Sequence, residues 1–211
     1  MIGFYDYTVI ATYLATILGV TGLFQAVDGK LTSAVLCLLL CGLLDTVDGK
    51  IARTKKDRTD SQKRFGIQID SLNDVICFGA LPAVIAYCAY VQKVSPAVPV
   101  WYTATLCFFA LCGLIRLAYF NVLEEERQET ESGVRKYYLG LPITASTLIF
   151  PLLCVLTNAL GHLPLIMGAG LLLTGVLYIA PLHVRKPNTA AIVILACVGI
   201  AELACFFVWK F

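Results

Sequence analysis

The sequence predicts an all-α integral membrane protein, folded as a bundle of 6–7 transmembrane helices. Two features of the composition point to this class: 59% of the 211 residues are hydrophobic, and only 14% carry a charge. A soluble domain cannot bury that much apolar surface in one core, so lipid is the expected solvent. The third observation is the recurrence of apolar runs of about 20 residues, the length that a helix needs to cross a bilayer.

The apolar runs divide the chain into seven expected spans. They cover residues 8–27, 31–52, 68–92, 99–122, 140–160, 163–182 and 189–209. Turn-forming residues separate them, as in Asp28-Gly29-Lys30 between the first two spans. Pro181 and the short connections around it also allow the last two runs to be re-entrant. Because spans occupy almost the whole chain, we expect residues 1–211 to form a single membrane-embedded domain.

The distribution of Lys and Arg predicts which loops face the cytoplasm. Of the 16 basic residues, 13 fall on one side of the expected bundle and three on the other. Because cytoplasmic loops carry the excess of positive charge, loops 53–67, 123–139 and 183–188 are expected in the cytoplasm. The chain is then a multi-pass protein of the cell (inner) membrane, with its N-terminus inside. A run of glutamates from Glu124 to Glu131 is expected to continue the fourth helix into water. The net charge of +2 is too small to suggest nucleic acid as a partner.

Four aspartates interrupt the apolar pattern at the facing ends of two neighbouring spans. Asp45 and Asp48 lie near the end of the second span, and Asp70 and Asp74 lie near the start of the third. Residues three or four apart share one face of a helix, so both pairs of carboxylates can point at a common cleft. Four carboxylates in one place repel one another. Divalent cations that prefer oxygen ligands, Mg2+ or Mn2+, would relieve that repulsion.

Small residues lie on the same helix faces as the aspartates. Gly49 and Ala52 accompany them on the second span, and Gly66 accompanies them on the third. These residues would open space for a bulky ligand beside the metals, while Lys50 and Arg53 supply positive charge near any phosphates. Two other interpretations of the aspartates stay open at this point: ordinary ion pairs with nearby basic residues, and a pathway for protons or ions.

Taken together, these residues resemble the signature of the CDP-alcohol phosphotransferases, which reads D-x2-D-G-x2-A-R, a short loop, and G-x3-D-x3-D. Every specified residue is present: Asp45, Asp48, Gly49, Ala52, Arg53, Gly66, Asp70 and Asp74. The signature covers residues 45–74, and its loop is longer than is common in the family. The resemblance implies about six core helices, usually in a homodimer, with a polar cleft open to the cytoplasmic leaflet.

The resemblance also implies a role for each residue of the signature. Asp45, Asp48 and Asp70 would be ligands of two divalent cations, Mg2+ or Mn2+, and Asp74 would join the metal site and act as general base. The residues implied to bind the CDP group are Asp45, Asp48, Gly49, Ala52, Arg53 and Gly66.

Segments beyond the signature resemble one branch of the family, the phosphatidylserine synthases. They are FGIQIDSLNDVICFGALPA (65–83), IRLAYFNV (115–122) and YYLGLPITA (137–145). This likeness implies CDP-diacylglycerol as the donor and L-serine as the acceptor, with phosphatidylserine and CMP as products. The alternatives are a sister enzyme that uses glycerol 3-phosphate or inositol phosphate, an ion-coupled transporter, and a noncatalytic scaffold.

Four further polar residues are candidates for binding the acceptor or a lipid phosphate. Arg116 lies inside the fourth span, where a buried arginine usually faces a cavity; a structural ion pair is the alternative. Asn121 would line the cleft or cap the helix. Arg135 and Lys136 would meet lipid phosphates or simply add to the positive charge of the cytoplasmic side.

Overall fold

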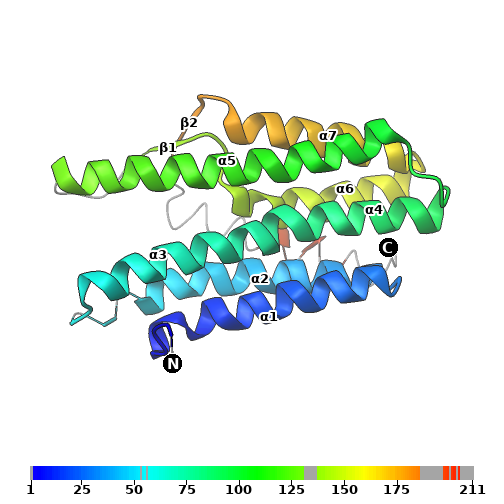
Figure 1. The fold of residues 1–211 in the computed structure, drawn as a ribbon. Helices are drawn as coiled ribbons and strands as arrows, with labels where there is room; N and C mark the ends of the chain where they lie inside the picture. The colour runs from blue at the N-terminus through cyan, green and yellow to red at the C-terminus, as the bar shows by residue number, and fades with distance from the viewer. Residues whose placement is uncertain are drawn as a thin grey trace.

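The computed structural model describes residues 2–52, 54–55, 57–130, 137–185, 197–199, 201–202 and 204. In this part of the chain, long helices run side by side in an elongated bundle (Figure 1). Five helical runs are long and apolar enough to cross a membrane, and α7 is apolar but shorter. The expected all-α, multi-pass membrane architecture is therefore confirmed.

The elements follow one another along the chain with few irregular connections. They are α1 (Tyr7–Val27), α2 (Leu31–Ala52), α3 (Asp60–Asp74), η1 (Val75–Ala80), α4 (Leu81–Lys93), α5 (Val100–Thr130), β1 (Tyr137–Leu139), η2 (Ile143–Ala145), α6 (Ser146–Leu160), α7 (Leu163–Ile179) and β2 (His183–Arg185).

Helices α1 and α2 form a hairpin, and α2 carries two of the four aspartates. Asp6 caps the start of α1, because its carboxylate accepts a hydrogen bond from the backbone N–H of Thr8 at 2.8 Å. The chain reverses at Gly29, whose φ of 82° favours glycine. Gly22 allows close packing of the two helices, since a Cβ there would lie 2.9 Å from the Cβ of Cys37 on α2.

The third span is one continuous helical run from Asp60 to Lys93, made of α3, η1 and α4. It begins before the predicted residue 68, because the first turns of α3 are polar and escape a search for apolar runs. The segment η1 is a π-helix that starts directly after Asp74. Pro82 follows in the next turn, and a wider turn accommodates it because proline has no N–H and clashes with the carbonyl four residues earlier.

Helix α5 continues past residue 122, where the fourth span was predicted to end, and reaches Thr130. The extension contains Glu124 and Arg127, whose side chains form an ion pair one turn apart. The predicted helical continuation of the glutamate run is therefore confirmed as far as Thr130. Residues 131–136 lie outside the described part of the chain.

Two short strands pair in a region where only helices and loops were predicted. Strands β1 and β2 are antiparallel, with Tyr138 opposite Val184. They join the segment before α6 to the end of α7, and α7 ends at Ile179 rather than at the predicted residue 182. Pro181 accounts for that early end, because a proline disfavours helical backbone in the residue before it.

The predicted fifth span, 140–160, ends where α6 ends but starts three residues too early, because the helical run begins with η2 at Ile143 and continues as α6 from Ser146. Gly140 follows β1 with a left-handed φ of 74°, which ends the strand and prevents a helix from starting there. Its N–H donates a hydrogen bond to the carbonyl of Leu182 at 2.8 Å. The predicted seventh span, 189–209, falls mostly outside the described residues.

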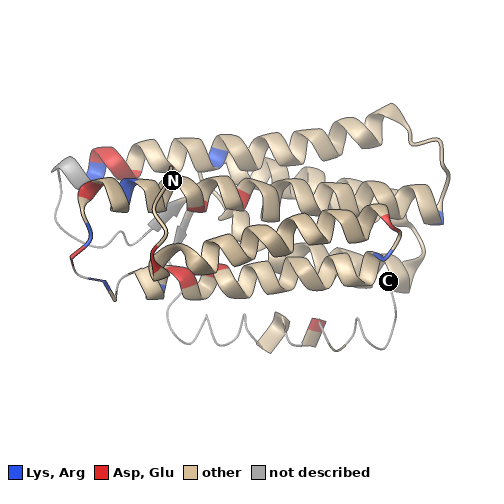
Figure 2. Ribbon diagram, turned by 60° about the horizontal axis from the view of Figure 1, so that its bottom comes forward, with Lys and Arg blue, Asp and Glu red and all other residues tan. Residues whose placement is uncertain are grey.

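Charged side chains are unevenly distributed along the bundle. Figure 2 shows most of the acidic and basic residues toward the end where α2 finishes and α3 begins, whereas the rest of the bundle is largely uncharged. The aspartates of α2 and α3 lie toward this charged end, so the candidate site is nearer to one end of the bundle than to its middle.

Candidate active site

Three aspartates from two helices meet between α2 and α3. One carboxylate oxygen from each of Asp45, Asp70 and Asp74 lies within 4.8 Å of the other two. Asp70 and Asp74 are one turn apart on α3, so both project from one face toward α2. The structure therefore brings together residues that the sequence separates by the whole α2–α3 loop.

Asp48 lies beside this group. Its side chain is only 7% exposed and contacts the carboxyl group of Asp70. Asp48 also accepts a hydrogen bond from Thr12 Oγ1 at 3.3 Å. Because Thr12 belongs to α1, the first helix forms a third wall of the site, which the sequence analysis did not anticipate.

The three-carboxylate group fits a divalent cation. Asp70 Oδ1 and Asp74 Oδ1 are buried and have no hydrogen-bond partner among the residues that the structure describes. Buried polar atoms without a partner are costly, and neighbouring carboxylates repel one another. An oxygen-only ligand set suits Mg2+ or Mn2+, which would satisfy these atoms and neutralise the charge.

A buried amide supports the aspartates from the α1 side. Asn73 is 2% exposed, and its Oδ1 accepts hydrogen bonds from Thr16 Oγ1 at 2.9 Å and from Cys77 Sγ at 3.3 Å. These contacts tie α3 to α1 and fix the helix that carries Asp70 and Asp74. Residue spacing does not predict this network, and the only sign of it in the sequence is a threonine and an asparagine inside apolar spans.

Arg116 reaches the site from α5. The residue is 9% exposed, its charge acts on Asp74, and its guanidinium lies 4.8 Å from the centre of the Phe120 ring. Arg116 also lines a cavity of about 280 Å³, together with Tyr119, Tyr178 and mostly apolar side chains of α5, β1 and the end of α7. A small molecule in this cavity would therefore meet a buried cation whose charge also acts on Asp74.

Asn121 connects α5 to α3 close to the same aspartates. Its Nδ2 donates a hydrogen bond to Ser71 Oγ at 2.8 Å, and Ser71 directly follows Asp70. Of the other basic candidates, Lys50 is exposed in the last turn of α2, and Arg53, Arg135 and Lys136 lie outside the described residues.

The small residues of the signature lie toward the α2–α3 loop. Ala52 is the last residue of α2, and Gly66 lies in the second turn of α3. Arg58 of the loop reaches the space between them: its Nη1 donates to the carbonyl of Ala52 at 3.5 Å, and its Nη2 donates to the carbonyl of Gln62 at 3.1 Å. From the sequence, Arg58 was expected only to add to the positive charge of its loop.

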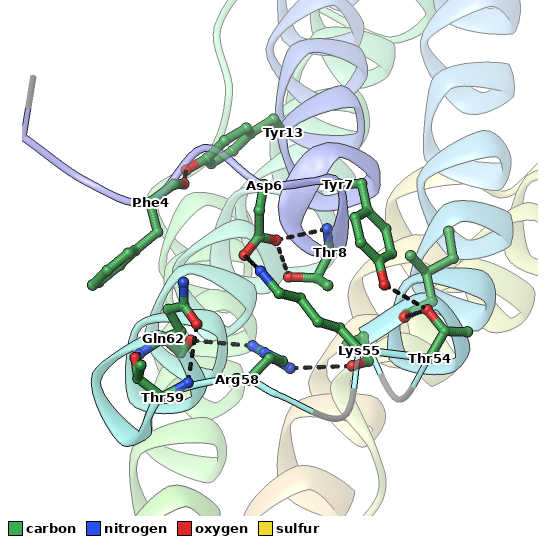
Figure 3. Close-up of polar contacts among 12 residues, drawn as sticks. Phe4, Asp6, Tyr7, Thr8, Tyr13, Thr54, Lys55, Arg58, Thr59 and Gln62 are labelled. Carbon is green, nitrogen blue, oxygen red and sulfur yellow. Dashed lines mark hydrogen bonds and ion pairs between the residues drawn. The ribbon is translucent and has the colours of Figure 1, made fainter.

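The α2–α3 loop is fastened to the N-terminal end of α1 (Figure 3). Lys55 Nζ forms an ion pair with the Asp6 carboxylate at 3.1 Å, and the hydroxyls of Tyr7 and Thr54 are hydrogen-bonded at 3.2 Å. The hydroxyl and backbone N–H of Thr8, followed by Lys55, lower the pKa of Asp6 to about 2. Asp6 is therefore ionised at neutral pH and holds the loop by charge.

Comparison with known proteins identifies similar sequences over the same region. Residues 8–180 match the family model described as CDP-alcohol phosphatidyltransferase. The chain is 39% identical to archaetidylserine synthase from Methanothermobacter thermautotrophicus over 59% of its own length and 47% of that protein. It is 31% identical to CDP-diacylglycerol–serine O-phosphatidyltransferase from Helicobacter pylori, over 81% of this chain and 67% of the relative. The protein of that name from Methanocaldococcus jannaschii is 30% identical, over 92% and 86%. The chain thus spans about half the length of the Methanothermobacter relative.

Proposed function

This chain belongs to the CDP-alcohol phosphatidyltransferase family, whose model matches most of its length, and from that premise we propose that it transfers the phosphatidyl group of CDP-diacylglycerol to L-serine. The products would be phosphatidylserine and CMP. The observation that carries the proposal is the group of Asp45, Asp70 and Asp74, with ligand oxygens within 4.8 Å of one another. Relatives named for transfer to serine support the choice of acceptor.

In the proposed mechanism the aspartates hold two divalent cations, Mg2+ or Mn2+. Asp45, Asp70 and Asp74 would supply ligand oxygens, and Asp48 would add a further one from beside Asp70. When bound, such cations neutralise the pyrophosphate and stabilise the departing CMP. Because α2 and α3 hold the carboxylates in place before the substrate arrives, little reorganisation is needed during the reaction.

Asp74 is the proposed general base. Its side chain is 7% exposed, so water competes little for its oxygens. It would accept the proton of the serine hydroxyl while the serine oxygen attacks the phosphorus that bears diacylglycerol. The new bond joins the serine oxygen to that phosphorus, and the bond that breaks joins the phosphorus to the bridging oxygen of the pyrophosphate. That oxygen leaves with CMP.

The acceptor is proposed to bind on the α5 side of the aspartates. Arg116 would pair with the serine carboxylate or a lipid phosphate, because it is a buried cation that opens onto a cavity. Asn121 would position the α3 side of the site through Ser71. Arg135 and Lys136 are proposed to meet lipid phosphates, while Gly49, Ala52, Arg53 and Gly66 would hold the CDP group with the aspartates of α2.

The reaction is proposed to take place at the cytoplasmic face of the cell (inner) membrane, in a homodimer. The support for this orientation is the presence of 13 of the 16 basic residues on one side of the expected bundle. The support for the homodimer is the family resemblance.

An acceptor screen tests the proposed function. Purified protein with CDP-diacylglycerol and Mg2+ or Mn2+ should release CMP when L-serine is added, and should not do so with glycerol 3-phosphate or inositol phosphate. Turnover with one of those acceptors but not with serine would identify a sister enzyme. If CDP-lipid neither binds nor reacts while an ion gradient drives a solute across vesicles, the chain is a transporter.

A further inference from the structure

One arginine of the α2–α3 loop projects into the space beside the aspartate site. A Cβ at position 66 would lie 2.5 Å from Arg58 Nη2, closer than real Cβ atoms come to a neighbour. Gly66 therefore leaves room for the guanidinium. The hydrogen bonds from Arg58 to the carbonyls of Ala52 and Gln62 place the group between the end of α2 and the first turns of α3.

Helix geometry relates Arg58 to the proposed metal ligands. Ala52 lies four residues after Asp48 on α2, and Gly66 lies four residues before Asp70 on α3. Each backbone position therefore lies about 6 Å along the helix axis, slightly more than one turn, from that of an aspartate. The guanidinium lies on the loop side of the Asp48–Asp70 contact, where a nucleotide phosphate would extend from the metal site.

Both arms of the loop are fixed around Arg58 (Figure 3). Before Arg58, the chain is held by the Lys55–Asp6 ion pair and the Thr54–Tyr7 hydrogen bond. After Arg58, Thr59 and Gln62 form a capping box that starts α3. A side chain that is positioned before its ligand arrives loses less conformational entropy on binding.

We propose that Arg58 binds a phosphate of the CDP group of the donor, an inference that rests on the proposed function. A guanidinium carries five N–H donors, and two of those of Arg58 are used by the carbonyls of Ala52 and Gln62. The Nε of Arg58 is buried without a hydrogen-bond partner in the described part of the chain. Donors therefore remain for a phosphate oxygen, and the fixed positive charge makes such bonds strong.

The test compares the affinities of CMP and cytidine, measured by calorimetry on detergent-purified full-length protein with Mg2+. Arg58→Ala should weaken CMP binding roughly 10- to 100-fold, the loss expected for a charge-assisted hydrogen bond, and should leave cytidine binding unchanged. Arg58→Lys should restore part of the affinity. Arg64→Ala, which removes an exposed positive charge from the neighbouring helix α3, should bind CMP like the wild type. In turnover, Arg58→Ala should raise the KM for CDP-diacylglycerol and leave the KM for serine unaltered.

Several results would overturn the proposal, and one would separate it from the proposed choice of acceptor. Equal CMP affinity in Arg58→Ala and wild type, at unchanged melting temperature, would remove Arg58 from the nucleotide site, even if serine transfer is confirmed. If Arg58→Ala changes only how anionic lipid in the micelle affects turnover, Arg58 binds the membrane surface instead of the nucleotide. Equal losses for CMP and cytidine would indicate a contact with the base or the loop fold. If the wild type binds CMP but fails to use serine, the acceptor is wrong while the role of Arg58 stands. Failure of the wild type to bind CMP would end both proposals.

Discussion

Among the aspartates of the site, Asp74 is the one on which the positive charge of Arg116 acts. It is also almost fully buried, and one of its oxygens lies in the three-carboxylate group. We predict that Asp74→Asn lowers CMP release about 100-fold or more, since a positioned general base contributes that much. Mn2+ binding, measured by electron paramagnetic resonance, should largely persist, because the amide keeps an oxygen and the other carboxylates remain.

Asp60 supplies the matched control, because it lies on the same helix with a side chain that is 91% exposed. Asp60→Asn should change neither turnover nor Mn2+ binding. Asp45→Asn should weaken the binding of Mn2+ instead. If Asp74→Asn loses Mn2+ affinity in proportion to its activity, the residue is a ligand alone and the proton goes elsewhere.

Asp6 gives the N-terminal anchor a defined pH dependence. Its pKa is about 2 in the folded protein, below the ordinary value of 3.8. The stabilising effect of the carboxylate is therefore fully present above the ordinary value and is lost as the pH falls through the folded value. Asp6→Asn keeps a good helix cap but removes the charge. Its melting temperature should lie below that of the wild type by a constant amount between about pH 5 and 8.

The pH scan itself distinguishes this explanation from a simple loss of packing. The gap between the two melting temperatures should narrow as the pH falls below about 4, because the Asp6 carboxylate of the unfolded chain then binds a proton, whereas that of the folded protein does so only near pH 2. A gap that stays constant down to pH 2, or widens on acidification, would contradict the assigned role of the Asp6 carboxylate.

Residue spacing predicted that the acidic faces of α2 and α3 lie close together, but it did not predict which other residues surround the aspartates. Asp45 and Asp48 are three residues apart, and Asp70 and Asp74 are four apart. Helix periodicity places residues at these intervals on one face, so the pairing can be read from the sequence alone. Thr12, Asn73 and Arg58 reach the site through the packing of α1 and the path of a loop. Such contacts depend on tertiary structure, and a polar residue inside an apolar span does not identify its partner.

At the scale of the elements, apolar length located the helices well and their polar ends poorly. The first two spans agree closely with α1 and α2, because the bilayer demands an unbroken apolar run. The polar start of α3 and the charged end of α5 extend beyond such runs, so hydropathy does not predict that these residues are helical. The β1–β2 pair was missed because each strand has only three residues, too few for an alternating pattern.

Gly140 directly follows strand β1 and packs closely against the end of α7. Its φ is 74°, and a Cβ at this position would clash with the carbonyl oxygen of Tyr178, a backbone atom that cannot move aside as a side chain can. Gly161 has a similar φ of 75° with nothing within 4 Å of a Cβ. We predict that Gly161→Ala costs about 1–2 kcal/mol, the strain of a left-handed residue, and that Gly140→Ala costs more.

Thermal unfolding of the two alanine variants in the same detergent measures this difference. Because both substitutions add the same methyl group at nearly the same φ, the difference between their melting temperatures reports mainly the clash with Tyr178. Equal shifts in melting temperature would mean that the segment between β1 and α6 moves freely away from α7, contrary to the hydrogen bond from Gly140 to Leu182.

At the scale of the whole molecule, the third span relates the charged end of the bundle to the bilayer. The helical run Asp60–Lys93 has 34 residues, which corresponds to about 51 Å at 1.5 Å per residue. The hydrocarbon core of a membrane is only about 30 Å thick. The two ends of this helical run must therefore emerge on opposite sides of the membrane. Lys63 lies near its first end and Lys93 is its last residue, and both are exposed.

The proposed orientation sets which lysine faces the cytoplasm. In a background without native cysteines, Lys63→Cys should react with a membrane-impermeant maleimide only after cells are opened, because the basic loops stay inside. Lys93→Cys should react in intact cells. Since both probes sit on the same helix, the reverse pattern would place the aspartates on the outer face, away from cytoplasmic CDP-lipid chemistry. Labelling of both from one side would mean that the run does not cross the membrane.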